Sequence, residues 1–287
     1  MDKTTPVSLP TELERGIFEL AAWQSPETIT TLILVARRVC IWIEPQLYRV
    51  VLSRDTERLQ QMMRSKPPEF LRNHVHHLAI CSSIPRNDIT LILSTCTHVH
   101  DLAVWTGDTY PELLADIRKL TNLQHLSIDL FELFGGDDQF QLPCVDELPF
   151  AHLTHLDIFT GEPEDPPPEK LWPVFGMLPC LTHLSFTDFY IREMVQMALD
   201  TCPVLQLLVI LWTDMEEEDI SSETADISDP RFCIIGCPLF ESDWEEGARG
   251  GLDFWCRAEI ACKGRGDSDG VVSQDARETS YSVPSPE

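Results

Sequence analysis

The chain has 287 residues, of which 43% are hydrophobic and 24% charged, and its formal net charge is -26. Such a length and composition predict a globular protein with a sizeable core, in one large domain or two smaller ones. Because so acidic a surface repels phosphate groups, nucleic acids and anionic membranes are not expected as partners, and a basic protein surface is favoured.

Segments that would direct the chain to or across a membrane are not visible. Residues 1–8 are polar, and the most apolar run, 204–212, is far shorter than the ~20 residues that span a bilayer. Ten cysteines are present without a C-x-x-C pair, so neither a zinc site nor a disulfide framework is predicted. We therefore expect a cytoplasmic or nuclear protein with reduced cysteines and no cofactor.

The first 66 residues predict a short helical segment. Residues 11–14 have capping-box spacing and open a helix. Residues 28–51 are ambiguous, because their β-branched content favours a strand whereas their length and apolar spacing favour a helix. Asp55 is expected to cap a further helix over 56–65, which Pro67 and Pro68 end.

Six segments between residues 72 and 210 share the pattern apolar-x-x-apolar-x-x-Leu-x-apolar, except that Arg72 occupies the first position of the first copy. Their common leucines are Leu78, Leu102, Leu126, Leu156, Leu184 and Leu208, with spacings of 24, 24, 30, 28 and 24 residues. The alternation at the end of each copy predicts a short strand with one buried face. One strand per ~20–29 residues, with a helix after it, predicts an α/β solenoid of the leucine-rich-repeat type over 67–262.

Helix-like stretches connect these strands at 88–95, 111–120, 168–178 and 191–201. Pro173 is expected to break the third, and Asp188 is a candidate cap for the fourth. Further on, 214–229 predicts an acidic loop, 231–236 a strand and 252–262 a helix that closes the solenoid at its end. Residues 263–287 have the composition of a disordered tail.

Four N-terminal segments, 9–13 (LPTEL), 17–20 (IFEL), 34–38 (LVARR) and 45–48 (PQLY), resemble the F-box, and leucine-rich repeats often follow that motif. The combination is similar to the F-box-like proteins that form large families in fungi. The resemblance implies docking on the Skp-type adaptor of an SCF ubiquitin ligase, a cullin-RING ligase, while the repeats bind a protein substrate of unknown identity. The adaptor anchors that it implies are Leu9, Pro10, Leu13, Ile17 and Phe18.

A polar row precedes the strand leucines and is expected to face away from the core, on the concave side of the solenoid. It consists of His77, Asp101, His125, His155 and His183. Because neighbouring strands lie ~4.8 Å apart, the rings are expected to form a ladder. Three interpretations stay open: a stacking residue with local hydrogen bonds, a zinc site from His125, His155 and His183, or a recognition surface that changes charge near pH 6.5.

The same outward row continues beyond the strands at Trp105, Asp129 and Phe159. Together with the polar row, these residues are candidates for binding a protein substrate. Trp105 and Phe159 are candidate anchors, because aromatic residues dominate binding hot spots, although packing under a neighbouring loop is the alternative.

Three functional hypotheses follow, and no enzyme is favoured among them, since phosphate-loop, dinucleotide, zinc-protease and serine-hydrolase motifs are missing. The leading one is a substrate-recognition subunit with an exposed apolar helix. The second is a repeat scaffold with a vestigial F-box, in which the repeats cover Leu13, Ile17 and Phe18. The third is a hydrolase or other metal-dependent enzyme that uses the histidine row.

Overall fold

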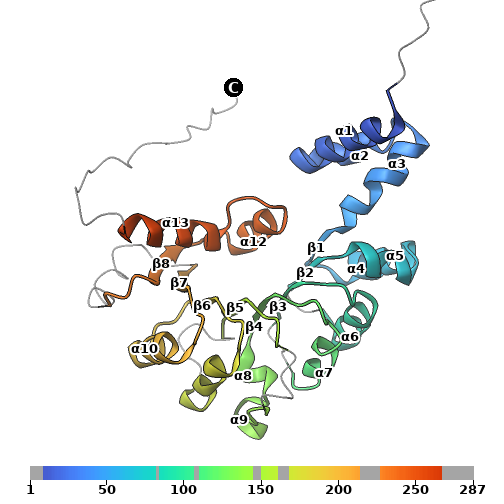
Figure 1. The fold of residues 1–287 in the computed structure, drawn as a ribbon. Coiled ribbons are helices and arrows are strands. Elements are labelled where there is room, and N and C mark those ends of the chain that lie inside the picture. The colour runs from blue at the N-terminus through green and yellow to red at the C-terminus, as the bar shows by residue number, and fades with distance from the viewer. Residues whose placement is uncertain are drawn as a thin grey trace, which may run out of the picture.

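The computed structural model describes residues 9–81, 84–106, 110–144, 150–160, 168–213 and 227–266. Eight parallel strands form one sheet in which spatial order equals chain order (Figure 1). The strands are β1 (Val50–Ser53), β2 (His77–Cys81), β3 (Asp101–Trp105), β4 (His125–Ile128), β5 (His155–Ile158), β6 (His183–Thr187), β7 (Leu207–Trp212) and β8 (Phe232–Gly236). An ordered parallel array with a return connection after each strand is a leucine-rich-repeat-like solenoid, as predicted.

The register of the sheet follows the sequence repeat. The repeat leucines pair in succession: Leu78 with Leu102, Leu102 with Leu126, Leu126 with Leu156, Leu156 with Leu184, and Leu184 with Leu208. Each is at most 2% exposed, because the two-residue alternation turns it toward the connecting helices. The predicted phase is therefore confirmed.

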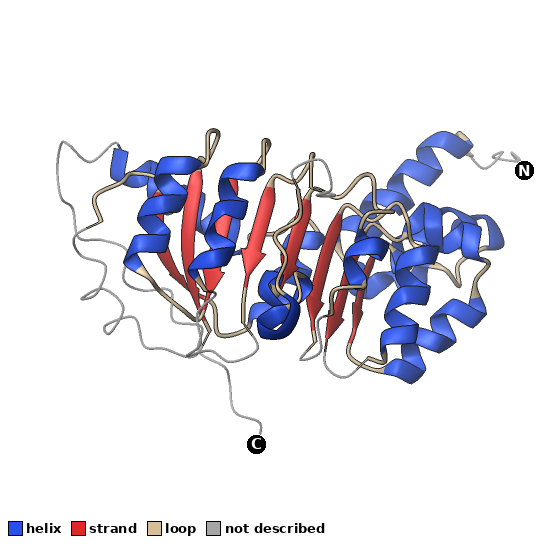
Figure 2. Cartoon of the chain, turned by 90° about the horizontal axis from the view of Figure 1, so that it is seen from below, coloured by secondary structure: helices blue, strands red, loops and turns tan. Residues whose placement is uncertain are grey.

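Helices cover one face of the sheet (Figures 1 and 2). On this side lie α4 (Thr56–Ser65), α5 (Pro68–His74), α6 (Arg86–Thr95), α7 (Leu113–Ile117), α8 (Leu130–Leu133), α9 (Gly136–Gln139), η4 (Glu169–Met177) and α10 (Arg192–Thr201). Asp55 caps α4 as predicted, accepting from the amide of Glu57 at 2.7 Å. The apolar sides of these helices and the repeat leucines form one continuous core.

Two local expectations on this side need correction. The stretch around Pro173 forms the 3-10 helix η4 rather than a broken α-helix. Asp188 does not cap α10, which begins after Ile191 without a side-chain cap. The backbone of Asp188 is left-handed, with φ of 61°. The Asp188 carboxylate accepts hydrogen bonds from the amide of Thr213 at 2.7 Å and from the Thr213 hydroxyl. The aspartate thus joins the ends of β6 and β7.

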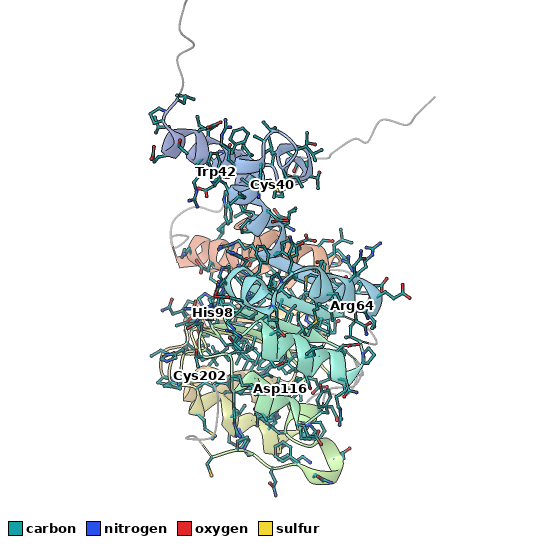
Figure 3. The ribbon with its side chains drawn as sticks, turned by 90° about the vertical axis from the view of Figure 1, so that its right-hand side faces the viewer. Cys40, Trp42, Arg64, His98, Asp116 and Cys202 are labelled. Atoms are coloured by element: carbon teal, nitrogen blue, oxygen red, sulfur yellow. The ribbon has the colours of Figure 1, made fainter. Side chains whose placement is uncertain are left out.

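The N-terminal helices form a unit with a small core of its own (Figure 3, with Cys40 and Trp42 labelled). They are α1 (Thr11–Gln24), η1 (Pro26–Thr28), α2 (Ile29–Leu32), α3 (Arg37–Ile43) and η2 (Glu44–Tyr48). Helix α1 starts at Thr11, so Pro10 rather than Thr11 is at the N-cap position and the capping box does not form. The Glu14 carboxylate pairs instead with Arg38 of α3. The ambiguous segment 28–51 contains α2, a turn at 33–36, α3 and η2, and its last two residues belong to β1.

The sheet begins earlier than the sequence indicates. Strand β1 pairs in parallel with β2 from Val50 onward, so the expected division between residues 66 and 67 falls inside the repeat region. Strand β8 matches the predicted strand over 231–236. Most of the predicted acidic loop (214–226) and of the predicted tail (267–287) lies outside the described residues.

The C-terminal part departs most from expectation. Helix α12 (Phe240–Ala248) was not predicted. The expected closing helix is present as α13 (Phe254–Gly266), but α12 lies between it and the last strand in the chain. Both helices lie on the inner side of the arc of strands, opposite α6, α7 and α10 (Figure 1). We call this inner side the concave face. No helix of the described ranges is long and apolar enough to cross a membrane.

Candidate functional site

The first candidate surface is an apolar side of α1. Leu13, Ile17 and Leu20 follow a helical spacing of four and three residues, so they lie on one side of the helix. They are 57%, 56% and 56% exposed, and Leu9, just before the helix, is 53% exposed. We call these four residues the docking face; Pro10 is exposed beside them.

The remaining predicted adaptor anchor, Phe18, has a different environment. Its ring is partly buried and packs against the core of the N-terminal unit, which contains Ala22, Ile29, Val39 and Ile43. Phe18 therefore holds α1 on α2 and α3. The packing leaves Leu13 and Ile17 on the outer side, where the described repeats do not cover them.

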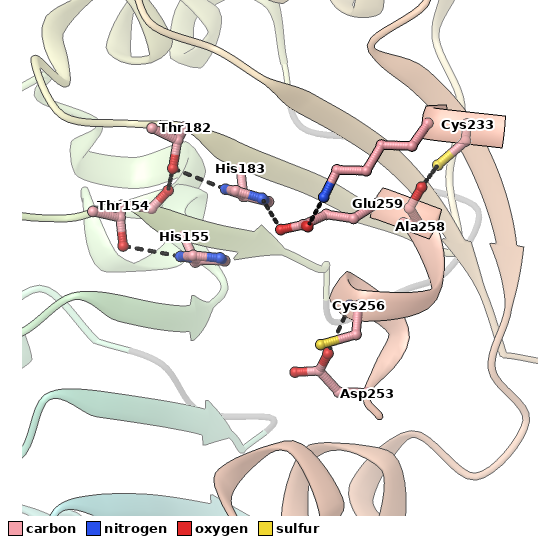
Figure 4. A network of polar contacts seen from close by, with 10 residues as sticks. Thr154, His155, Thr182, His183, Cys233, Asp253, Cys256, Ala258 and Glu259 are labelled. Atoms are coloured by element: carbon pink, nitrogen blue, oxygen red, sulfur yellow. Dashed lines mark hydrogen bonds and ion pairs between the residues drawn. The ribbon is translucent and has the colours of Figure 1, made fainter. Parts of the chain in front are cut away.

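The second candidate surface is the concave face, where the register brings the predicted polar row together. His125, His155 and His183 stack with ring centroids 4.0 and 4.1 Å apart, which confirms the predicted ladder. Threonines precede two of the rings: the hydroxyl of Thr154 lies 2.9 Å from His155 Nδ1, and that of Thr182 lies 2.8 Å from His183 Nδ1 (Figure 4). Local hydrogen bonds thus orient the ladder.

At the other end of the row, His77 and Asp101 form a pair. His77 Nδ1 lies 3.0 Å from Asp101 Oδ2. The other carboxylate oxygen accepts a hydrogen bond from the indole nitrogen of Trp244 at 3.2 Å. Both oxygens of this carboxylate are thus engaged.

Burial keeps the ladder uncharged. It lowers the pKa of His155 to about 2, with a further contribution from the two flanking imidazoles. Burial also lowers the pKa of His125 and of His183, although the Glu259 carboxylate beside His183 opposes the shift there. Neutral imidazoles can stack at this distance without repulsion, so the ladder acts as a structural element at neutral pH.

The polar row is covered rather than open, which corrects the expectation of a free recognition surface. Trp255 of α13 packs edge-on against His155 and His183, with centroids 5.3 and 5.7 Å away. Glu259 of the same helix lies 3.2 Å from His183 Nε2 (Figure 4). As a consequence, His183 is only 7% exposed.

Trp105 is likewise covered, by α12. Its ring contacts Phe240 and Trp244, with centroids 4.8 and 5.8 Å away, and its indole nitrogen donates to Ser127 Oγ at 2.7 Å. It is therefore a packing partner of α12 and not an exposed anchor.

The last two candidates of the outward row lie elsewhere. Asp129 is 5% exposed, and its carboxylate accepts from the amide of Glu132 at 3.1 Å, so it caps α8. Phe159 is partly exposed just beyond β5 and stays a candidate.

A buried carboxylate that was not singled out from the sequence lies at the centre of the concave face. Asp157, 3% exposed, accepts hydrogen bonds from Ser127, Ser185 and Thr187 at 2.6, 2.6 and 2.7 Å. Burial raises the pKa of its carboxyl, whereas the three hydroxyl groups oppose the shift. A signal was present: an aspartate between two buried strand residues, in register with serines of both neighbouring strands.

Between the concave face and the C-terminal helices remains a cavity of about 80 Å³. His125, His155 and Asp157 line it from the sheet, and Trp244 and Trp255 line it from the helices. Across the described ranges, no cluster of three or more His, Cys, Asp or Glu side chains has a metal-binding arrangement. The ladder thus has the geometry of stacked rings rather than of a metal centre.

No protein-family model and no curated protein matches the chain. Among solved structures, the leucine-rich repeat-containing protein LegL7 from Legionella pneumophila is similar to it with a TM-score of 0.37 and 9% sequence identity, over 70% of this chain and 79% of that one. A likeness at this level carries no weight for the fold or the function. The repeat architecture follows from the order and register of the strands themselves.

Proposed function

We propose that this chain is a non-catalytic protein-interaction module whose N-terminal unit docks on a Skp-type adaptor. The observation that supports this proposal is the docking face, four large apolar side chains that are each more than half exposed. Exposed apolar residues grouped on one side of a helix are typical of a protein interface, because leaving them in water is unfavourable.

The small core beneath the docking face also supports the proposal. Four residues are fully buried inside the N-terminal unit, so α1 is held in place without using Leu13 or Ile17. The alternative, a repeat scaffold with a vestigial F-box, requires the repeats to cover these side chains, and they are 57% and 56% exposed. The ubiquitin chemistry would come from other subunits, and this chain would supply proximity.

A binding experiment with a purified Skp-type adaptor tests the proposal. The double variant Leu13→Asp/Ile17→Asp is the decisive one, because both side chains are exposed and the charges leave the core of the unit untouched. We expect the wild type to bind and the double variant to lose at least about tenfold in affinity, since a buried unpaired charge opposes binding. Phe18 is unsuited to this test, because its ring packs in the core.

A matched control is available in the repeats. Leu91 of α6 is 52% exposed, so Leu91→Asp adds the same kind of charge to a different surface. The control is expected to bind like the wild type. No binding by the folded wild type would reject the ligase role and leave the scaffold; equal binding by the double variant would reject the docking face.

A further inference from the structure

Helix α12 contacts the sheet through two aromatic side chains. Phe240 and Trp244 are four residues apart, so they lie on one side of the helix, and both rings contact Trp105. Below Trp244 the concave face is lined by the small side chains of Ala79, Cys81 and Ala103, which are at most 1% exposed. We call these three residues the floor.

Polar groups fix the orientation of α12 on the floor. The Trp244 indole donates to Asp101 at 3.2 Å, and the Glu241 carboxylate pairs with Arg54 just beyond β1. The floor therefore offers space for an indole ring, an aromatic wall, an acceptor for the indole N–H and a cation for a carboxylate. Each of these features selects a chemical group, as a recognition site for a helix does.

The two C-terminal helices are held with unequal strength. Helix α13 is anchored on β7 and β8 by Phe254 and Ala258, which are 3% and 0% exposed. The rings of Phe240 and Trp244 in α12 are only partly buried, and the Arg54–Glu241 pair is about half exposed, with side-chain exposures of 54% and 40%. Exposed ion pairs contribute little, so α12 is the weakly held member.

Other contacts of α12 do not involve the floor. Asp243 accepts from the amide of Phe254 at 2.7 Å and pairs with Arg257, which joins α12 to α13. The cavity of about 80 Å³ beside Trp244 deprives the ring of part of the packing that a closed core would provide. Separation of α12 from the floor thus breaks the contacts of Phe240 and Trp244 with Trp105 and the hydrogen bond to Asp101, but it leaves the hydrogen bond between Asp243 and α13 in place.

We infer that the floor, Trp105, Asp101 and Arg54 form a binding site for an aromatic helix of a partner protein, and that α12 occupies this site in the resting chain. The partner helix carries two aromatic residues four positions apart, the second a tryptophan, and a carboxylate next to the first. It binds by displacing α12, while α13 stays on β7 and β8. This inference goes beyond the adaptor proposal and does not depend on it.

Two native cysteines allow a test on the unmodified chain. Cys81 lies in the floor beneath α12, whereas Cys96 lies in the core at the end of α6. They are 1% and 0% exposed, and burial raises the pKa of each thiol to about 12, so they are closely matched. With iodoacetamide and mass spectrometry, we expect Cys81 to be alkylated at least about tenfold faster than Cys96, because local opening needs less free energy than global unfolding. Equal rates would overturn the inference.

The chemistry of the partner is tested with a peptide of residues 238–250, which contains α12. In the double variant Phe240→Ser/Trp244→Ser, Cys81 is expected to react faster than in the wild type. The peptide, at millimolar concentration, should slow that reaction at least threefold, and a peptide with the same two serines should not. No protection of a folded double variant, or equal protection by both peptides, would overturn the inference.

Discussion

The indole N–H of Trp244 donates to the carboxylate of Asp101 at 3.2 Å, across a sequence separation of 143 residues. The repeat pattern predicts Asp101 in an outward-facing polar row, whereas no pattern in the sequence indicates a contact for Trp244. Their contact shows why the concave face is not open: a helix from the C-terminal part supplies the partners of the row.

Replacement of Trp244 tests how much this contact contributes to stability. Trp244→Ala removes the hydrogen bond and the contact with Trp105, so we expect a loss of about 1.5–3 kcal/mol in the free energy of unfolding, measured with urea. Leu239, one residue before α12 and 72% exposed, serves as the control. Leu239→Ala should change the value by less than about 0.5 kcal/mol, and an equally small effect of Trp244→Ala would contradict the assignment.

The histidine ladder predicts a loss of stability in acid. The pKa of His155 is lowered to about 2 in the folded chain, and those of His125 and His183 are also lowered. The unfolded chain therefore binds more protons below its histidine pKa of about 6.5, and the contribution of the neutral ladder, complete above that pH, is lost as the pH falls. Each strongly shifted histidine is expected to lower the free energy of unfolding by about 1.4 kcal/mol per pH unit below that value.

Charged groups around the ladder also affect the pH dependence of the free energy of unfolding. Asp101 and Asp253 favour the protonated form of His125, whereas His77 opposes it. Asp253 and Glu259 favour the protonated form of His183. His155 lies between the two other imidazoles, so it is the cleanest position to change. Urea unfolding of His155→Gln between pH 7 and pH 5 should show a shallower pH dependence than the wild type. The exposed His152→Gln should retain the full slope, and an unchanged slope for His155→Gln would exclude the ladder as its source.

The buried carboxylate of Asp157 predicts a large structural effect. Asp157→Ala leaves the hydroxyls of Ser127, Ser185 and Thr187 without their common acceptor, and we expect a loss of about 3 kcal/mol in the free energy of unfolding. Asp137, whose side chain is 94% exposed, is the matched aspartate, and Asp137→Ala should be nearly neutral. Thermal unfolding followed by circular dichroism compares the two; equal midpoints would mean that the network contributes nothing.

The left-handed backbone of Asp188 predicts the relative stability of three variants at this position. Asn retains an acceptor for the Thr213 amide and tolerates φ of 61°, Gly tolerates the angle but loses the acceptor, and Ala lacks both advantages. We therefore expect stability to fall from Asp188→Asn to Asp188→Gly to Asp188→Ala, with about 1 kcal/mol between the last two. If Ala were as stable as Gly, backbone strain would not be important at this position.

Much of the repeat region could be predicted because its signals are local. The leucines from Leu78 to Leu208 recur in phase, and this periodicity determines both the strands and their register. The ladder followed from the same register, since it sets which histidines become neighbours. Strand β1 was not predicted, because Val50–Ser53 overlaps the end of an ambiguous apolar run and lacks the repeat pattern.

Predictions failed where distant segments meet. The helix over 252–262 was expected from its composition, but its place on the concave face depends on how Trp255 fits the rings of His155 and His183. Such complementarity has no counterpart in periodicity or spacing. For Trp105, packing against another segment was one of the two alternatives, but its partners Phe240 and Trp244 could not be identified, since they lie far along the chain.

The order of the strands, together with the position of α12, has a consequence for how the molecule unfolds. In a sheet ordered from β1 to β8, every strand pairs only with its neighbours in the chain, and such an array can lose its terminal repeats one at a time. Helix α12 connects the C-terminal end of the array to Arg54 and Asp101 near its beginning. This link joins the two ends of the array only while α12 stays on the concave face, so the terminal repeats are expected to unfold more cooperatively with α12 in place than after its displacement.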